Sequence, residues 1–252
     1  MRSICLALLM AATTLPATAH AAPANVKASV AATGARTEAN VKLDASRKPV
    51  QMLAFLGLQK GLRVVDMFGA NQYWAEIIAP AVGPKGHVTV WQPAQFLNDK
   101  RRESFAAFAA KQKNVTLISS PFEAPALPRN AYDFMLMNLD YHDVYWQSAE
   151  RKIPRMEPRP WLRALYASMK PGGIVGIIDH SAAPGGNTRA VVEKLHRIDE
   201  AVVLADFKRA GFQLVGRSNL LRNRADNRSL SVFDEKIRGK TDRFILKFRK
   251  PR

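Results

Sequence analysis

Histidines accompanied by carboxylates follow two apolar runs of the sequence. The run "YDFMLMNL" is followed closely by His142 and Asp143, and the run "GIVGII" is followed by Asp179 and His180. Histidine suits the role of general base, because its reference pKa of about 6.5 lies close to working pH. These residues indicate proton transfer, with His142 as the base and either Asp179 or Asp143 orienting it.

Two further residues of the first segment, Asn138 and Tyr141, are predicted to position a substrate or a cofactor. Considered singly, each histidine is equally well interpreted as an ordinary loop residue. A metal site built from His142, His180 and His196 lacks the spacing that characterises such sites, so no metal is expected.

The segment "LHRID" allows two interpretations. His196 and Asp199 are three residues apart and share one face of an expected helix over residues 191–209. Arg197 then either clamps a carboxylate or phosphate of a substrate, or forms an ion pair on an exposed helix face.

A third region, "VVDMFGANQYW", has the pattern of a strand, a glycine turn and a helix. Asp66 ends the apolar run and Gly69 follows in the turn. Such turns in nucleotide-binding α/β proteins usually carry two or three glycines, but Asn71 and Gln72 stand here instead. Asparagine tolerates positive φ, so the turn is expected to survive, whereas Gln72 is expected to narrow the pocket.

Short apolar strands alternate with helices along the chain, which predicts parallel strands joined by right-handed crossovers. The last two strands have no helix between them and are expected to pair antiparallel. A helix with Ser46 as its N-cap and Pro49 in its first turn is expected to precede the first strand. The predicted fold is α/β, a doubly wound, mostly parallel Rossmann-like sheet with a C-terminal antiparallel strand. Its expected strands are 62–68, 87–91, 115–119, 132–139, 173–179, 212–221 and 242–250.

This arrangement resembles the class I S-adenosylmethionine (SAM)-dependent methyltransferase fold. "GLRVVDMFGANQYWAEIIAPAVGPKGHVTVWQP" is similar to the family's first strand, turn, helix and second strand, and "MKPGGIVGIIDHSA" to its fifth strand. "NAYDFMLMNLDYHDVYW" looks like the fourth strand with its catalytic loop. More narrowly, "YHD", "IDHSA", "LHRID", "AGF" and "RGKTDRFILKFRKP" resemble a group of exported bacterial proteins called predicted methyltransferases. The resemblance covers about residues 36–251.

The resemblance implies SAM as cofactor and methyl transfer to a small molecule or an envelope component. Asp66 would receive the ammonium group, and Gln92 stands where the family usually has an acid for the ribose. Trp91 and Phe122 are expected to sandwich the purine. The residues predicted to bind the cofactor are Asp66, Gly69, Asn71, Tyr73, Trp91, Gln92 and Asn138. The residues predicted to be catalytic are Tyr141, His142, Asp143, Asp179 and His180. The alternative is a catalytically silent relative that binds another ligand.

The N-terminus predicts export. Residues 1–21 have the pattern of a signal peptide cleaved after Ala21, so a periplasmic or secreted protein is expected. Residues 22–45 are expected to form a linker or helical extension, and residues 46–252 the α/β domain. The single cysteine, Cys5, lies inside the signal, which excludes disulfides and cysteine-zinc sites from the mature chain.

The chain is strongly basic, with a formal net charge of +17. Twelve lysines or arginines and four acids lie in residues 217–252. Such charge favours an anionic membrane or envelope surface, or it forms a solvated basic face. Nucleic acid is not expected, because the chain is predicted to be exported and no aromatic-basic motif accompanies the charge. The methyl acceptor and the oligomeric state remain open from the sequence.

Overall fold

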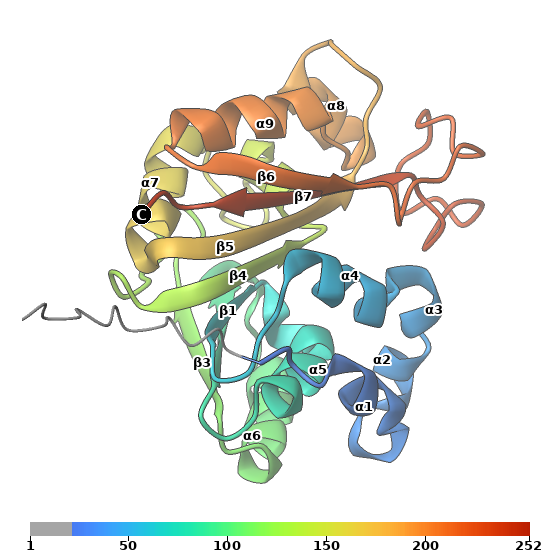
Figure 1. The fold of residues 1–252 in the computed structure, drawn as a ribbon. Coiled ribbons are helices and arrows are strands. Elements are labelled where there is room, and N and C mark those ends of the chain that lie inside the picture. The colour runs from blue at the N-terminus through green and yellow to red at the C-terminus, as the bar shows by residue number, and fades with distance from the viewer. Residues whose placement is uncertain (1–21) are drawn as a thin grey trace, which may run out of the picture.

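One seven-stranded sheet forms the centre of the computed structural model, which describes residues 22–252 (Figure 1). The predicted signal peptide, residues 1–21, lies outside the described residues. The strand order is β3-β2-β1-β4-β5-β7-β6. The strands are β1 (Arg63–Met67), β2 (His87–Pro93), β3 (Val115–Ser120), β4 (Tyr132–Asn138), β5 (Met169–His180), β6 (Gln213–Ser218) and β7 (Arg243–Arg249).

Strands β1 to β5 are parallel, and β7 pairs antiparallel with both β5 and β6. The predicted α/β fold with a C-terminal antiparallel strand is therefore confirmed. The connection from β6 to β7 contains neither helix nor strand, so β7 returns beside its predecessor in the opposite direction. Because β7 starts where β5 ends, this β6–β7 loop (219–242) lies at the carboxyl end of β5.

Helices cover both faces of the sheet (Figure 1). One core cluster contains residues of α7 and α9, and a second contains residues of α4, α5 and α6. The helices are α1 (Val26–Ala31), α2 (Glu38–Val41), α3 (Asp44–Arg47), α4 (Pro49–Leu56), α5 (Tyr73–Val82), α6 (Asp99–Lys111), α7 (Pro158–Ser168), α8 (Thr188–Leu195) and α9 (Glu200–Arg209). Short 3₁₀ turns include η2 (Gly69–Asn71) and η4 (Tyr141–Tyr145). No helix within residues 22–252 is long and apolar enough to cross a membrane.

The helix expected over residues 191–209 is two helices. His196 ends α8 in the left-handed conformation at φ 51°, and the side chain of Asp199 caps α9. Between them, Ile198 pairs with Ser181 just beyond β5, and its N–H bonds to the carbonyl of His180. The helical pattern breaks here because the backbone hydrogen bonds go to the end of a strand instead.

The segment before the first strand also differs from the prediction. Ser46 lies inside α3 rather than capping α4, whose N-cap is Lys48 at φ 47° with Pro49 next in the chain. Residues 26–31 form α1, which packs on α4 and α5. The N-terminal extension is therefore packed onto the sheet's helices rather than being a loose linker.

Candidate functional site

The carboxyl ends of β1, β4 and β5 lie side by side, because β4 pairs in parallel with both β1 and β5. Asp66 is paired in register with Leu136, and Asn138 with Ile178, next to Asp179. This brings the candidate residues into two neighbouring groups. We call Asp66, Gly69 and Gln92 the β1–β2 half of the site. His142, Asp143, Asp179 and His180 form the β4–β5 half.

Asp179 orients His142 in the β4–β5 half. The His142 ring atom Nδ1 lies 2.8 Å from Asp179 Oδ1, and the His142 backbone N–H donates to Oδ2 at 2.9 Å. A third donor, the N–H of His180, reaches Oδ1 at 2.7 Å. Both His142 and Asp179 are buried. Of the two carboxylates predicted to orient the imidazole, Asp179 is therefore the one bonded to it.

Asp143 faces the other side of the same ring. Its Oδ1 lies 3.3 Å from His142 Nε2 and has no hydrogen-bond partner among the described residues. Burial alone would lower the pKa of His142, but the negative charges of Asp179 and Asp143 outweigh burial and raise that pKa to about 9. Burial raises the pKa of Asp143 to about 6. At neutral pH the proton therefore lies on His142, and Asp143 is the group able to accept another.

Two more imidazoles lie next to His142. The ring centroids of His180 and His196 are 6.0 and 5.6 Å from that of His142. His180 Nδ1 bonds to Thr241 Oγ1 at 2.7 Å, and burial lowers the pKa of His180 to about 3. Burial and the charge of His142 lower the pKa of His196 to about 4. One charged and two neutral imidazoles thus meet here, and no metal-binding group is found in residues 22–252.

Asp66 is the least satisfied polar residue of the site. It is 1% exposed, and neither carboxyl oxygen has a hydrogen-bond partner within residues 22–252. Burial raises the pKa of Asp66 to about 8, a shift that Arg47 opposes. A Cβ placed on Gly69 would lie 2.2 Å from Asp66 Oδ2, so the turn packs directly on the carboxyl group. This contact explains why position 69 holds a glycine.

The turn between β1 and α5 keeps its shape without further glycines. Positive φ falls on Phe68 (56°) and Gln72 (65°), and not on Asn71 as the sequence suggested. Asn71 instead accepts a hydrogen bond from the N–H of Tyr73. The side chain of Gln72, which was expected to narrow the pocket, instead donates to Ser104 Oγ of α6 at 2.9 Å.

Gln92 and Trp91 both bond within the protein. Gln92 Oε1 accepts from the N–H of Ala70 in the turn at 3.1 Å. The indole of Trp91 donates to Ser120 Oγ at 3.0 Å, and its ring is fully buried. Trp91 and Phe122 are 6.4 Å apart and tilted by 48°, so they do not form the expected purine sandwich. Both rings belong to the core instead.

The remaining predicted residues have mixed placements. Tyr141 is fully buried and its hydroxyl donates to Asp206 of α9, so it holds a helix rather than a substrate. The hydroxyl of Tyr73 donates to Asp44 Oδ1 at 2.8 Å. Asn138 is half-buried at the end of β4.

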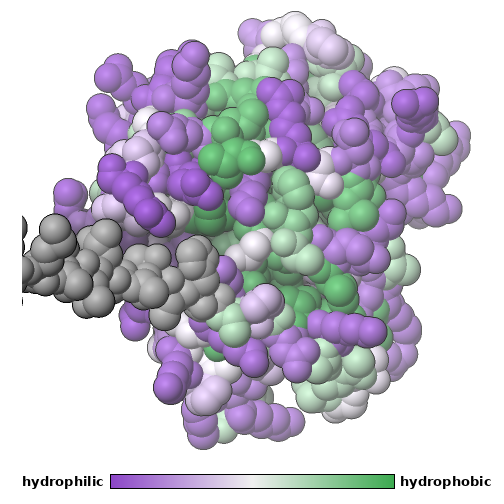
Figure 2. All heavy atoms as spheres, in the orientation of Figure 1, coloured by the Kyte–Doolittle hydropathy of each residue, from purple (hydrophilic) through white to green (hydrophobic). Residues whose placement is uncertain are grey.

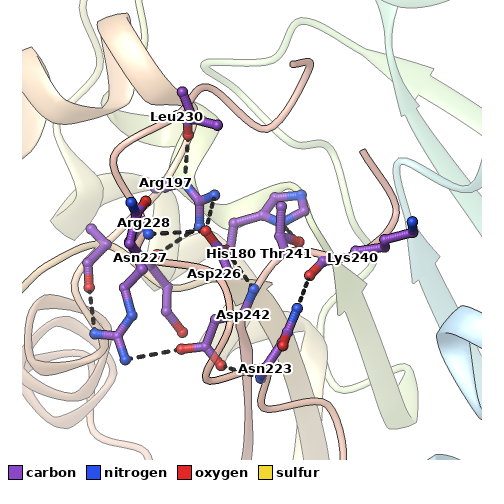
Figure 3. A network of polar contacts seen from close by, with 12 residues as sticks. His180, Arg197, Asn223, Asp226, Asn227, Arg228, Leu230, Lys240, Thr241 and Asp242 are labelled. Atoms are coloured by element: carbon purple, nitrogen blue, oxygen red, sulfur yellow. Dashed lines mark hydrogen bonds and ion pairs between the residues drawn. The ribbon is translucent and has the colours of Figure 1, made fainter. Parts of the chain in front are cut away.

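Arg197 is buried, so both interpretations of it were wrong. Its guanidinium bonds to both oxygens of Asp226, at 2.8 and 3.1 Å, and to the carbonyls of Leu230 and Ser181 (Figure 3). Neither a substrate nor solvent reaches it. The ion pair holds the β6–β7 loop, which places Thr241 against His180. Arg197 therefore acts on the site indirectly, by holding the loop whose Thr241 bonds to His180.

Sequence reasoning also missed Arg47. It ends α3, and its guanidinium carbon lies 4.2 Å from the centroid of the Tyr73 ring. It is a source of positive charge acting on Asp66. No strand-end motif includes Arg47, because it comes from the segment before the first strand.

Comparison with solved structures identifies the fold. A SAM-dependent methyltransferase from Aquifex aeolicus aligns with a TM-score of 0.57 and 18% identity, covering 88% of this chain and 98% of that one. The [4+2]-cyclase SpnF aligns with a TM-score of 0.59 and 16% identity, over 92% and 98%. The chain therefore has the class I SAM-dependent methyltransferase fold, as predicted. A cyclase shares this fold, so the fold alone does not define the reaction.

Comparison with sequences of known proteins adds methyltransferase relatives. No protein-family model matches the chain. The demethylmenaquinone methyltransferases of Listeria monocytogenes and Listeria innocua are 27% identical over 133 residues, which is 52% of this chain and 50% of theirs. The chain thus spans about half the length of the curated relatives it matches.

Proposed function

We propose that the protein is a SAM-dependent methyltransferase that deprotonates its acceptor with the His142–Asp143 pair. One observation carries the proposal: an unsatisfied buried carboxyl, Asp66, ends β1 beside the imidazole–carboxylate group at the ends of β4 and β5. Buried groups with strongly shifted pKa values gather at functional sites more often than elsewhere. The fold and the methyltransferase relatives support the same activity.

The β1–β2 half fits the cationic end of SAM. Asp66 offers two free oxygens to an ammonium group, and binding a cation would favour its ionised form. Gly69 leaves the backbone close to that carboxyl. Gln92 Nε2 donates no hydrogen bond within residues 22–252, which leaves a donor for a ligand oxygen. When bound, SAM supplies a methyl group that its sulfonium already activates.

The β4–β5 half can take a proton from a hydroxyl or an amine. With its pKa of about 6, Asp143 is mostly ionised at neutral pH and has an unpartnered oxygen. His142, held by Asp179, provides a fixed positive charge beside it. The acceptor's proton would pass to Asp143, and the imidazolium would stabilise the negative charge left on the acceptor.

We propose a small molecule as the acceptor, in preference to an envelope polymer. The relatives are named for a small molecule, demethylmenaquinone, and this chain matches half of their length.

Calorimetric titration with S-adenosylhomocysteine tests the cofactor assignment. We expect binding to the wild-type protein and a loss of binding in Asp66→Ala. Asp99→Ala, an exposed acid in the first turn of α6, is the matched control and should bind normally. The absence of heat at millimolar ligand would contradict the proposal.

The second candidate function is a silent protein of the same fold that binds another ligand. Two observations favour it: Gln92 is already bonded to Ala70, and core packing fills the space between Trp91 and Phe122. This candidate predicts that Asp66→Ala leaves binding of the true ligand intact.

We also propose that the protein is exported after cleavage behind Ala21. The short apolar run and the small residues before that position support it. Cell fractionation and N-terminal mass measurement test this: a chain retaining residues 1–21 in the cytosol would contradict export.

The basic region 217–252 is proposed to bind an anionic envelope surface. Figure 2 shows one face of the whole molecule, on which hydrophilic residues gather around the edge and apolar residues nearer the middle. Cosedimentation with vesicles containing anionic lipid should occur at low salt and disappear at high salt, because salt screens exposed charges. Equal binding to neutral vesicles would contradict it.

A further inference from the structure

Arg47 brings a positive charge to the β1–β2 half from outside the sheet. It ends α3, and its guanidinium stacks on the ring of Tyr73, the first residue of α5. The carboxyl groups whose charges act on it include Asp140, Asp66 and Asp44. Arg47 therefore lies over the first residue of α5, directly after the turn that packs on the unsatisfied Asp66.

The guanidinium has no partner of its own. No hydrogen bond and no ion pair joins the Arg47 side chain to any residue from 22 to 252. The nearby Asp44 is already occupied, because both of its oxygens accept from Arg36 at 2.7 and 2.8 Å. Asp44 also accepts from the Tyr73 hydroxyl. An arginine packed on an aromatic ring but left without an acceptor has donors to offer to a ligand.

Burial disfavours the ionised form of the other two carboxyl groups, Asp66 and Asp140. Burial raises the pKa of Asp66 to about 8, and burial together with the charge of Asp143 raises the pKa of Asp140 well above its ordinary range. With a pKa of about 8, Asp66 is mostly protonated at neutral pH. Within residues 22–252, no carboxylate accepts a hydrogen bond from the Arg47 guanidinium, and no donor reaches either oxygen of Asp66.

We propose that Arg47 binds the carboxylate of an α-amino-acid group whose ammonium binds Asp66. A single zwitterionic group would satisfy both residues at once. The inference rests on the proposed function, in which the amino-acid end is that of SAM, and it adds that this end, rather than the nucleoside, sets the ligand's affinity. A nucleoside without an amino-acid end should bind weakly and independently of Arg47.

Two probes separate the parts of this proposal. S-adenosylhomocysteine carries the amino-acid end, and 5′-methylthioadenosine lacks it. In calorimetric titrations, Arg47→Ala should weaken S-adenosylhomocysteine binding by about 10- to 150-fold, the range for a hydrogen bond to a charged group. Binding of 5′-methylthioadenosine should not change. Arg47→Lys should restore part of the affinity, since lysine keeps the charge but loses the two-pronged geometry.

Arg63→Ala is the matched control, because Arg63 is exposed at the opposite end of β1. Thermal melts of each variant show whether the fold is kept, and Arg47→Lys carries the comparison if Arg47→Ala fails to fold. Equal S-adenosylhomocysteine affinity in the wild type and in the Arg47 variants would overturn the inference while leaving the proposed function intact. A wild-type protein that binds neither probe would overturn both.

Discussion

The two halves of the site contain the same kind of group in opposite conditions. Asp179 and Asp66 are both buried carboxyl groups at strand ends. Three N–H donors reach Asp179, whereas none reaches Asp66 within the described residues. As a result, the pKa of Asp179 is lowered despite burial, largely by His142, and that of Asp66 rises to about 8. Burial alone therefore does not decide the charge of a carboxyl group; its donors do.

The difference indicates how the halves divide the work. A fully bonded group keeps its geometry without a ligand, which suits residues that move protons. An unsatisfied buried group costs stability, and such a cost is typical of positions that a ligand completes. The His142–Asp179 pair of the β4–β5 half is thus preorganised, whereas Asp66 in the β1–β2 half lacks the partner that a bound cation would supply.

The largest effect on stability is expected when the His142–Asp179 pair is broken. Asp179→Ala removes the partner of a buried imidazolium, and loss of one partner of a buried pair costs about 3–5 kcal/mol. We expect the free energy of unfolding in urea to fall by that amount at neutral pH. The loss should shrink as pH rises from about 6.5, the ordinary pKa of histidine, to about 9, above which His142 is neutral in the folded protein as well. A variant as stable as the wild type would mean that the imidazole is not held as described.

Asp66→Asn should raise the free energy of unfolding, whereas Asp179→Ala lowers it. The folded-state pKa of about 8 lies above the ordinary value of 3.8. The folded protein therefore keeps a proton that the unfolded chain releases, and wild-type stability falls as pH rises between these two values. Asparagine does not titrate, so the free energy of unfolding of the variant lacks this pH dependence. The difference between the variant and the wild type should therefore grow in favour of the variant by at most about 1.4 kcal/mol per pH unit. Between pH values of about 5 and 7 this amounts to about 3 kcal/mol. Urea unfolding of both proteins across that window measures it, and parallel pH profiles would contradict it.

The α/β fold, and the placement of Asp66, His142 and Asp179 at the ends of neighbouring strands, could be predicted from the sequence. Alternating apolar strands and helices define which strand ends lie together, and these residues directly follow apolar runs. The prediction needed only local pattern and a resemblance to a known fold.

Residues whose surroundings depend on contacts between distant segments could not be predicted. Arg197 has the pattern of a helix surface, but Asp226 reaches it from a loop without periodicity. His196 joins the other imidazoles only because Ile198 bonds to the end of β5. Trp91 has the expected position in β2, yet aromatic neighbours enclose it. Such contacts are set by long-range packing, which a single sequence does not reveal.

Gly69→Ala, in the β1–β2 half, should lower the free energy of unfolding by about 1–3 kcal/mol. This is the usual cost of forcing an extra methyl group into a packed site. The φ of Gly69 is not in the left-handed region, so the clash with Asp66 Oδ2 is the cause. A double-mutant cycle with Asp66→Ala isolates it: removing the carboxyl should make Gly69→Ala nearly neutral. Additive effects of the two changes on urea unfolding would show that the turn does not rest on Asp66.

The smallest effect is expected at Thr241, the partner of His180 in the β4–β5 half. Thr241→Val removes the hydroxyl that bonds to His180 Nδ1 at 2.7 Å and keeps the side chain's shape. A neutral hydrogen bond of this kind contributes about 0.5–1.5 kcal/mol, so the loss in unfolding free energy should fall in that range. The pKa of His180, lowered mainly by burial, should stay below that of His142 in an NMR titration. A His180 that titrates near its ordinary value in the variant would mean that Thr241, rather than burial, keeps it neutral. In that case a residue of the β6–β7 loop would belong to the preorganised group, because it would set the charge of His180.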